Sequence, residues 1–299
     1  MQVGIVGLGR MGSGIAERLI RAGFDVYGYD PHDAAGDDVQ GLRREDSLVD
    51  LVRALKAPRR IWVMAPAGRA TTGVIDVLCD LLERGDSLVD GGNSHYPDAI
   101  ATARRFESAG IEFLDVGTSG GIGGRERGYS LMVGGTPQAV SEWSEVFRSL
   151  APTPDTGWAH VGPSGAGHFA KMIHNGIEYG MMQAMAEGVA VLAAEGSPEV
   201  DLQAALHAWQ DGSIITSALL DVLVRVVADN PDLEGIAPRV ADSGEGRWAV
   251  AAALERNVSA PVITQALLER LRSRDDGRMA DRVLAALRGG FGGHDVPKS

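Results

Sequence analysis

A glycine-rich turn near the start of the chain constrains the fold more than any other feature. A strand-like run at residues 3–6 leads directly into it, and a helical pattern follows over 13–22. The turn consists of Gly7, Leu8, Gly9, Arg10, Met11 and Gly12. A GxGxxG spacing provides a tight turn, a close approach of backbone to pyrophosphate and close packing of helix on strand, while the helix N-terminus faces the phosphates. The pattern predicts a dinucleotide-binding turn.

An acidic residue stands where the ribose of a dinucleotide is held in such folds. A second strand-like run at 26–29 ends at Asp30, about where a carboxylate accepts hydrogen bonds from ribose hydroxyls. Asp30 would repel the 2′-phosphate of NADP, and residues 31–33 include no arginine to hold one, so NAD is favoured over NADP. The alternative is a glycine turn that only packs a helix on a sheet, with Asp30 capping a turn; it explains each residue separately but not their joint order.

The chain falls into two parts by its pattern. Through about residue 162, strand-like runs alternate with helical patterns, which is typical of a mostly parallel, doubly wound sheet. These runs are 3–6, 26–29, 60–65, 87–90, 113–116, 131–133 and 158–161, and later helices are expected over 219–229, 247–256, 261–274 and 278–288. We therefore expect an α/β, Rossmann-like domain over 1–162 and an all-helical domain over 163–299. Glycines at 289–293 predict an extended C-terminal tail.

Composition disfavours several classes of partner. A net charge of -12 repels nucleic acid and anionic membranes. No apolar run approaches the roughly 20 residues that cross a bilayer, and the single cysteine, Cys79, excludes an intrachain disulfide. The histidines show no metal-ligand spacing. We expect a cytoplasmic protein without a metal, whose site needs a local positive patch if the substrate is a small anion.

Four polar side chains share one stripe of a helix with apolar neighbours. Lys171, His174, Asn175 and Glu178 stand at i, i+3, i+4 and i+7, a spacing that places them on one helical face, with the first and last about 10 Å apart along the axis. The flanking sequence at 180–194 is almost wholly apolar, which predicts a core helix. The alternative is a solvated face with ordinary surface charges, but buried charges are retained mainly where function needs them.

The two ends of this stripe suit proton transfer. A desolvated lysine beside a positive nicotinamide can be neutral enough to take a hydroxyl proton, which is the base that oxidation of an alcohol requires. A glutamate kept protonated by burial can supply a proton to carbon. We therefore expect Lys171 and Glu178 to act at different points of one substrate.

Five motifs together carry a family resemblance. They are the turn at 7–12, Asp-Gly-Gly-Asn-Ser at 90–94, Thr-Ser-Gly-Gly at 118–121, Lys-Met-Ile-His-Asn-Gly-Ile-Glu-Tyr-Gly at 171–180, and Arg-Gly-Gly-Phe-Gly-Gly-His at 288–294. On these motifs nearly the whole chain resembles the decarboxylating 6-phosphogluconate dehydrogenases, in particular their shorter, NAD-preferring form. The resemblance implies that Lys171 is the base for the 3-hydroxyl, that hydride passes from C3 to NAD, and that the β-keto acid loses CO2. Glu178 would then protonate C1 of the resulting enediol to give ribulose 5-phosphate.

The same resemblance implies the contacts of a small anionic sugar acid. The carboxylate and hydroxyl end would be held by Asn93, which also lies at the cofactor, and by Ser119, Gly120 and Gly121, with His174 and Asn175 orienting it. The phosphate would be held by Tyr179 and Arg270, with Arg288 and His294 reaching over from a neighbouring subunit. A tail that crosses between subunits implies a homodimer or homotetramer.

One loop departs from the family pattern. Long, NADP-using members carry a phosphate-binding lysine and threonine in the loop that corresponds to residues 242–248, where this chain reads Ser-Gly-Glu-Gly-Arg at 243–247. Arg247 could substitute as a phosphate ligand, whereas Glu245 would oppose a phosphate.

Two other functions share part of the pattern. A β-hydroxyacid dehydrogenase, with a substrate such as 3-hydroxyisobutyrate, shares the opening turn, a Ser-Gly-Gly turn and a lysine, but typically follows the lysine with paired asparagines. A non-catalytic NAD-sensing protein needs the glycines and Asp30 but has no use for Lys171 opposite Glu178.

Overall fold

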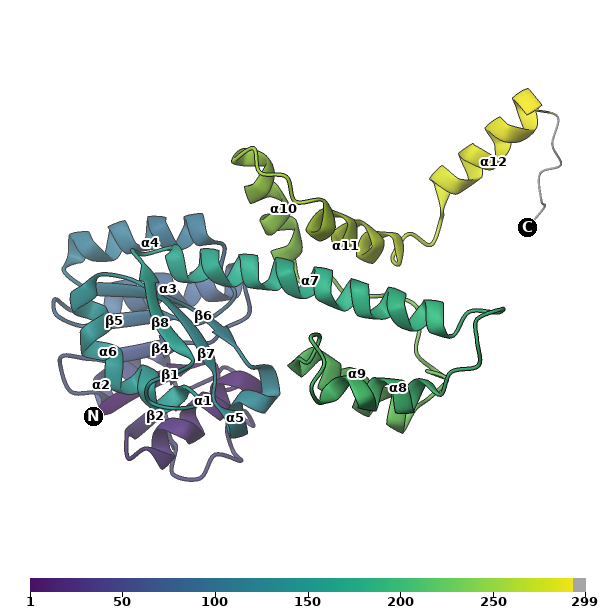
Figure 1. Ribbon diagram of the computed structural model, residues 1–299. Helices are drawn as coiled ribbons and strands as arrows, with labels where there is room; N and C mark the ends of the chain where they lie inside the picture. Colours follow the sequence, from purple (N-terminus) through teal and green to yellow (C-terminus); the bar gives the residue numbers. More distant parts are fainter. Residues whose placement is uncertain (293–299) are drawn as a thin grey trace. The chain divides into compact units, whose positions relative to one another are not determined.

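The computed structural model describes residues 1–292 (Figure 1). The chain divides into two compact units, residues 1–174 and residues 175 onward, so that the division falls within the long helix α7 (Ala166–Leu192). The strands are β1 (Gln2–Val6), β2 (Asp25–Tyr29), β3 (Arg43–Arg44), β4 (Arg60–Val63), β5 (Ser87–Asp90), β6 (Glu112–Ser119), β7 (Ser130–Gly134) and β8 (Trp158–Gly162). The helices of the first unit are α1 (Arg10–Arg21), α2 (Leu48–Ala54), α3 (Arg69–Leu81), α4 (Tyr96–Ala109), the 3-10 helix η1 (Gly121–Gly123), α5 (Gly124–Arg127), α6 (Pro137–Leu150) and the first part of α7.

The eight strands form one sheet in the order β3-β2-β1-β4-β5-β6-β7-β8, in which only the β6–β7 pair is antiparallel. Chain order reverses between β1 and β4, which is the switch point where doubly wound sheets bind ligands beyond the carboxyl ends of their strands. The predicted doubly wound α/β class is confirmed. The sequence pattern missed β3, a two-residue strand made of Arg43 and Arg44, which carries no apolar signal.

Both faces of the sheet are buried. Along β4, Ile61 and Val63 pack with α2, α3 and α4, whereas Trp62 between them packs with α1 and α6. Successive side chains of a strand point to opposite faces, so a run that is apolar at every position is what a sheet covered on both sides requires. The core therefore fixes the strand ends on which the turns at the sheet's carboxyl edge depend.

The described residues of the second unit form helices joined by loops, without a strand. It contains the remainder of α7, α8 (Leu202–Gln210), α9 (Ala218–Asp229), α10 (Glu245–Glu255), α11 (Pro261–Arg272) and α12 (Met279–Gly292). The predicted helical character is confirmed, although α8 was not anticipated. The prediction that the last helix ends at residue 288 is wrong, because α12 continues to Gly292. Adding a residue to an existing helix costs much less free energy than forming its first turn.

One expectation for α7 is wrong for the single chain. The apolar stretch at 180–194 was expected in a core, yet Met181 is 41% exposed and Val191 is 68% exposed. Helices α8 and α9 cover only the side of α7 that carries Met185 and Val189. The other apolar side of this part of the helix is left uncovered by the described residues.

Candidate active site

The glycine turn has the geometry that a dinucleotide needs. Gly7 has φ 93°, and a Cβ added there would lie under 3.0 Å from the backbone oxygen of Met64. A Cβ at Gly12 would likewise lie under 3.0 Å from the backbone oxygen of Gly7, whereas a Cβ at Gly9 would meet nothing within 4 Å. Two glycines thus permit close packing, and the third leaves open space at the helix N-terminus, where a pyrophosphate can approach the backbone. Arg10 and Met11 begin α1 beside this space.

Asp30 is tied to the glycine turn. Its Oδ2 accepts a hydrogen bond from the Leu8 N–H at 2.7 Å, and its Oδ1 accepts one from the His32 N–H at 2.9 Å. Burial opposes ionisation of this side chain, but the N–H groups of His32 and Leu8 outweigh it and hold the pKa of Asp30 below its usual value. A charged carboxylate with remaining lone pairs can still accept from ribose hydroxyls. The residues present therefore fit NAD.

Successive residues on one face of strand β6 contact successive turns of helix α7. Asp115, Gly117 and Ser119 alternate along β6 and so share one face of the sheet. The Asp115 carboxylate accepts hydrogen bonds from the N–H groups of Gly165 (2.6 Å) and His168 (2.8 Å) at the start of the helix.

The next two steps bring predicted site residues to the end of β6. A Cβ added at Gly117 would lie under 3.0 Å from the Cβ of Lys171, so the lysine packs directly on the strand backbone. Ser119 Oγ lies 3.4 Å from His174 Nε2. Lys171 is only 7% exposed, and Gly120 and Gly121 follow with φ of 130° and 53°. The structure thus gathers Lys171, His174 and the Ser119 turn in the first unit.

A buried ion pair lies one helical turn before Lys171. His168 Nε2 is 3.3 Å from Asp90 Oδ2, and the two side chains are 1% and 2% exposed. Desolvation opposes both charges, but their mutual attraction raises the pKa of His168 and lowers that of Asp90. The Asp90 carboxylate also accepts hydrogen bonds from the Gly92 N–H (3.1 Å) and the Ser94 hydroxyl (2.6 Å).

Sequence reasoning missed the part that Asp90, Asp115 and His168 play. The only signal in the chain for two of them was proximity to motifs already singled out, because Asp90 opens the 90–94 motif and His168 precedes Lys171 by three residues. Asp115 lies within an apolar strand and carried no signal. Asn93, the fourth residue of the 90–94 motif, is exposed.

In the second unit, two predicted phosphate ligands lie together. The Arg270 guanidinium lies 3.6 Å from the centroid of the Tyr179 ring. The Tyr179 hydroxyl donates to Asp242 Oδ1 at 3.3 Å, and Arg247 Nε donates to the other oxygen of the same carboxylate. Burial opposes the charge of Asp242, but the hydrogen bonds from Arg247 and the Gly244 N–H outweigh it and lower the pKa of Asp242. Glu245 is buried and accepts from the Ser243 hydroxyl at 2.8 Å.

The remaining predicted residues are placed as follows. Asn175 is buried and Glu178 is half-buried on the same helix as Lys171. Arg288 is exposed on α12, and His294 lies outside the described residues. Residues 1–292 contain no helix long and apolar enough to cross a membrane, and no cluster of three potential metal ligands was found among the side chains described.

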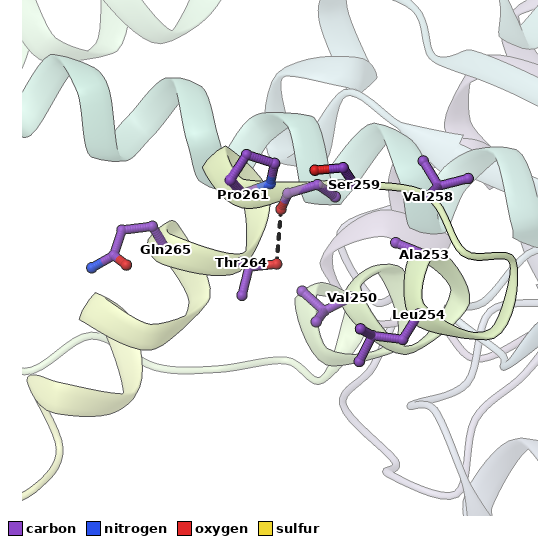
Figure 2. A pocket seen from close by; sticks show the side chains of 9 residues that line it. Val250, Ala253, Leu254, Val258, Ser259, Pro261, Thr264 and Gln265 are labelled. Carbon is purple, nitrogen blue, oxygen red and sulfur yellow. Dashed lines mark hydrogen bonds between the residues drawn. The ribbon is translucent and has the colours of Figure 1, made fainter.

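The second unit also contains an apolar groove. This groove of about 380 Å³ lies between α10 and α11 (Figure 2), and Thr264 on its wall donates to the Ala260 carbonyl. Its lining consists of Val250, Ala253, Leu254, Val258, Ser259, Ala260, Pro261, Thr264 and Gln265. None of these side chains titrates, so the groove can bind apolar surface but cannot perform acid–base chemistry.

The chain combines a glycine turn at the switch point of a doubly wound sheet with a buried lysine on helix α7. These two features define a dehydrogenase of the two-domain, nicotinamide-dependent class. Comparison with known proteins makes the assignment narrower. A family model described as the NAD binding domain of 6-phosphogluconate dehydrogenase matches residues 2–162. A second, described as the 6-phosphogluconate dehydrogenase C-terminal domain, matches residues 167–289. The chain belongs to the 6-phosphogluconate dehydrogenase family, and the resemblance stated above is confirmed.

Individual relatives agree. A Haloferax volcanii protein named as an NAD(+)-dependent, decarboxylating 6-phosphogluconate dehydrogenase is 43% identical over 302 residues, covering 100% of this chain and 99% of that protein. A putative 6-phosphogluconate dehydrogenase of Bacillus subtilis is 40% identical over the full length of both chains. Among solved structures, Plasmodium falciparum 6-phosphogluconate dehydrogenase matches with a TM-score of 0.84 at 24% identity, covering 100% of this chain and 66% of that one. Mycobacterium tuberculosis 3-hydroxyisobutyrate dehydrogenase matches with a TM-score of 0.74 at 22% identity, covering 92% and 94%; both structures show the shared fold.

Proposed function

We propose that the protein oxidises 6-phosphogluconate with NAD and releases CO2 and ribulose 5-phosphate. One observation carries the proposal beyond the family assignment: Lys171 is buried against the backbone of Gly117, beside the pair of Ser119 and His174 at the carboxyl edge of the sheet. Burial disfavours the charged form of a lysine. This amine is therefore suited to accept a proton from an alcohol.

The residues take distinct parts in the reaction. Bound NAD, held by the turn at Gly7–Gly12 and by Asp30, supplies the hydride acceptor. Lys171 takes the proton of the 3-hydroxyl as the C3 hydrogen leaves as hydride, and the hydroxyl becomes a ketone. The C1–C2 bond electrons then move toward that ketone as CO2 departs, which leaves an enediol. Glu178 delivers a proton to the former C2 of the substrate, which is C1 of the enediol and of the ribulose 5-phosphate product.

Substrate contacts follow the same assignment. Asn93, Ser119, Gly120 and Gly121 hold the carboxylate and hydroxyl end, and His174 and Asn175 orient it. Tyr179 and Arg270 hold the phosphate, and their stacked arrangement at 3.6 Å supports this assignment. Arg247 adds a second cation at the same loop, although it is paired with Asp242.

The carboxylate of Asp30 gives a preference for NAD over NADP, because a second negative charge at the ribose is repelled. The protein is also proposed to work in the cytoplasm as a homodimer or homotetramer. Uncovered apolar side chains on α7, the groove in Figure 2 and the exposed Leu284 and Leu287 of α12 support association, because a soluble chain rarely leaves so many such surfaces free. Arg288 and His294 would then complete a partner's phosphate site.

Initial rates with purified protein test the proposal. With NAD, 6-phosphogluconate should give NADH at a kcat/KM at least about a hundred times that for 3-hydroxyisobutyrate, because a site that pairs with a phosphate strongly rejects a substrate without one. The reverse order would support the β-hydroxyacid function instead. NAD binding without turnover of either compound would support a sensor.

A further inference from the structure

We propose that the buried pair of Asp90 and His168 is a positioning device for the reaction, which holds the loop that carries Asn93 at a fixed place against the helix that carries Lys171. The inference rests on the proposed function of Asn93 and Lys171. Neither member of the pair touches substrate in that proposal, and each acts through a neighbour.

Asp90 organises the loop on its own side. It is the last residue of β5, and its carboxylate accepts hydrogen bonds from the Gly92 N–H and the Ser94 hydroxyl while it lies in ion-pair contact with His168. These two hydrogen bonds enclose Asn93 from both sides in the chain. The carboxylate thus fixes the backbone from which the Asn93 side chain projects.

His168 is fixed in turn by the helix on which it lies. The backbone N–H of His168 donates to the Asp115 carboxylate, which also accepts a hydrogen bond from the Gly165 N–H. Two charge-assisted hydrogen bonds at a helix N-terminus set both its position and its rotation. Lys171 lies three residues further, packed on Gly117 of the same strand as Asp115. The ion pair therefore links two site elements that are each anchored to the sheet.

Stability alone does not account for this pair. Desolvation of two fully buried charges offsets much of their attraction, so a buried ion pair is weak evidence of net stabilisation. A buried contact that joins a loop to a helix does matter for a reaction in which a displacement of about 1 Å can lower the rate about a hundredfold. The opposite end of the same strand offers a comparison, because Asp86 directly precedes β5 and forms an ion pair at 2.9 Å with Arg59, in which Asp86 is buried and Arg59 is 17% exposed.

The test compares His168→Leu, His168→Gln and Asp90→Asn with the matched control Asp86→Asn. For each protein we would measure the melting temperature, the Kd for NAD, and KM and kcat for 6-phosphogluconate per folded molecule. His168→Leu should lower kcat about a hundredfold and raise the KM for 6-phosphogluconate, because the contact that fixes the position of Asn93 relative to Lys171 is removed. His168→Gln keeps an N–H donor and should recover about tenfold of that loss, and Asp90→Asn should resemble His168→Leu more than it resembles the control.

The Kd for NAD should change by much less than kcat in all four variants, at most about fivefold, because the glycine turn and Asp30 follow β1 and β2, at least two strands away from β5 in the sheet, and only Asn93 joins the cofactor to the displaced loop. Asp86→Asn should lower the melting temperature and leave kcat within about twofold. Equal effects of His168→Leu and Asp86→Asn on kcat, or a His168→Gln variant no better than His168→Leu, would overturn the inference. If His168→Leu does not fold, His168→Gln and Asp90→Asn against the control decide the same question. Wild-type protein that forms no NADH from 6-phosphogluconate refutes the proposed function itself, whereas an active wild type with unimpaired His168 variants refutes only this inference.

Discussion

The contact between Gly117 and Lys171 allows a single added methyl group to test how the lysine is placed. In Gly117→Ala the new Cβ would start under 3.0 Å from the Lys171 Cβ and 2.8 Å from the Gly167 carbonyl oxygen. Carbon atoms in contact lie about 3.5–4.0 Å apart, so β6 and α7 must separate by at least about 0.5 Å. Neither neighbour is the far end of a flexible side chain, so the backbone has to move.

The expected cost has two parts. Overpacking a well-packed contact destabilises a protein by about 1–3 kcal/mol. Displacing the Lys171 amine by about 0.5–1 Å should lower kcat by about 10- to 100-fold. Urea unfolding gives the first quantity, and initial rates at saturating NAD give the second.

A glycine on helix α7, which carries Lys171, serves as the control. A Cβ at Gly188 of α7 would meet nothing within 4 Å, so Gly188→Ala should raise stability by up to about 1 kcal/mol through helix propensity and leave kcat unchanged. Gly117→Ala with wild-type kcat and stability would refute the claim that Lys171 is held by close packing on β6.

Three further predictions test the site separately. Lys171→Met should lower the rate of hydride transfer by about a thousandfold while the Kd for NAD changes little; retained turnover in stopped-flow measurements would remove Lys171 as the base. Asp30→Ala should move the ratio of kcat/KM for NAD and NADP toward NADP, and an unchanged ratio would discount the part assigned to Asp30. The pKa of Asp90 is lowered in the folded protein, so its stabilising effect is present above the unfolded pKa of about 4 and is lost as pH falls through the folded pKa. The pKa of His168 is raised in the folded protein, so its stabilising effect is present below the unfolded pKa of about 6.5 and is lost as pH rises through the folded pKa. The difference in unfolding free energy between wild type and Asp90→Asn should therefore be largest between about pH 4 and 6.5, and a difference that stays constant from pH 3 to 9 would contradict the ionised pair.

The sequence was sufficient for those features that depend on local order. Strand runs bounded by turns placed seven of the eight strands, because a sheet buried on both faces leaves near-continuous apolar runs. The glycine turn and the stripe that begins at Lys171 could be predicted because both depend on spacing within one element. Tyr179 and Arg270 were paired only through the family resemblance, since no spacing relates residues so far apart.

What the sequence could not give depends on contacts between distant segments. Asp90 and His168 stand far apart in the chain, and only the register that sets Asp90 opposite Asp115 in neighbouring strands brings them to one place. The exposed Met181 and Val191 were misjudged for a related reason: an apolar helix indicates that something covers it, but not whether the cover belongs to the same chain. Arg43 and Arg44 form a strand only through their pairing with β2. An apolar sequence pattern therefore could not predict this strand.

The most direct test of the central claim is the stoichiometry of a complete reaction. Purified protein, NAD and 6-phosphogluconate labelled with ¹³C at C1 would be followed by absorbance for NADH and by mass spectrometry for labelled CO2. We predict one labelled CO2 for each NADH formed, with both products lost together in Lys171→Met. NADH that accumulates without labelled CO2 would contradict this prediction, because the chain would then oxidise the hydroxyl without breaking the carbon–carbon bond.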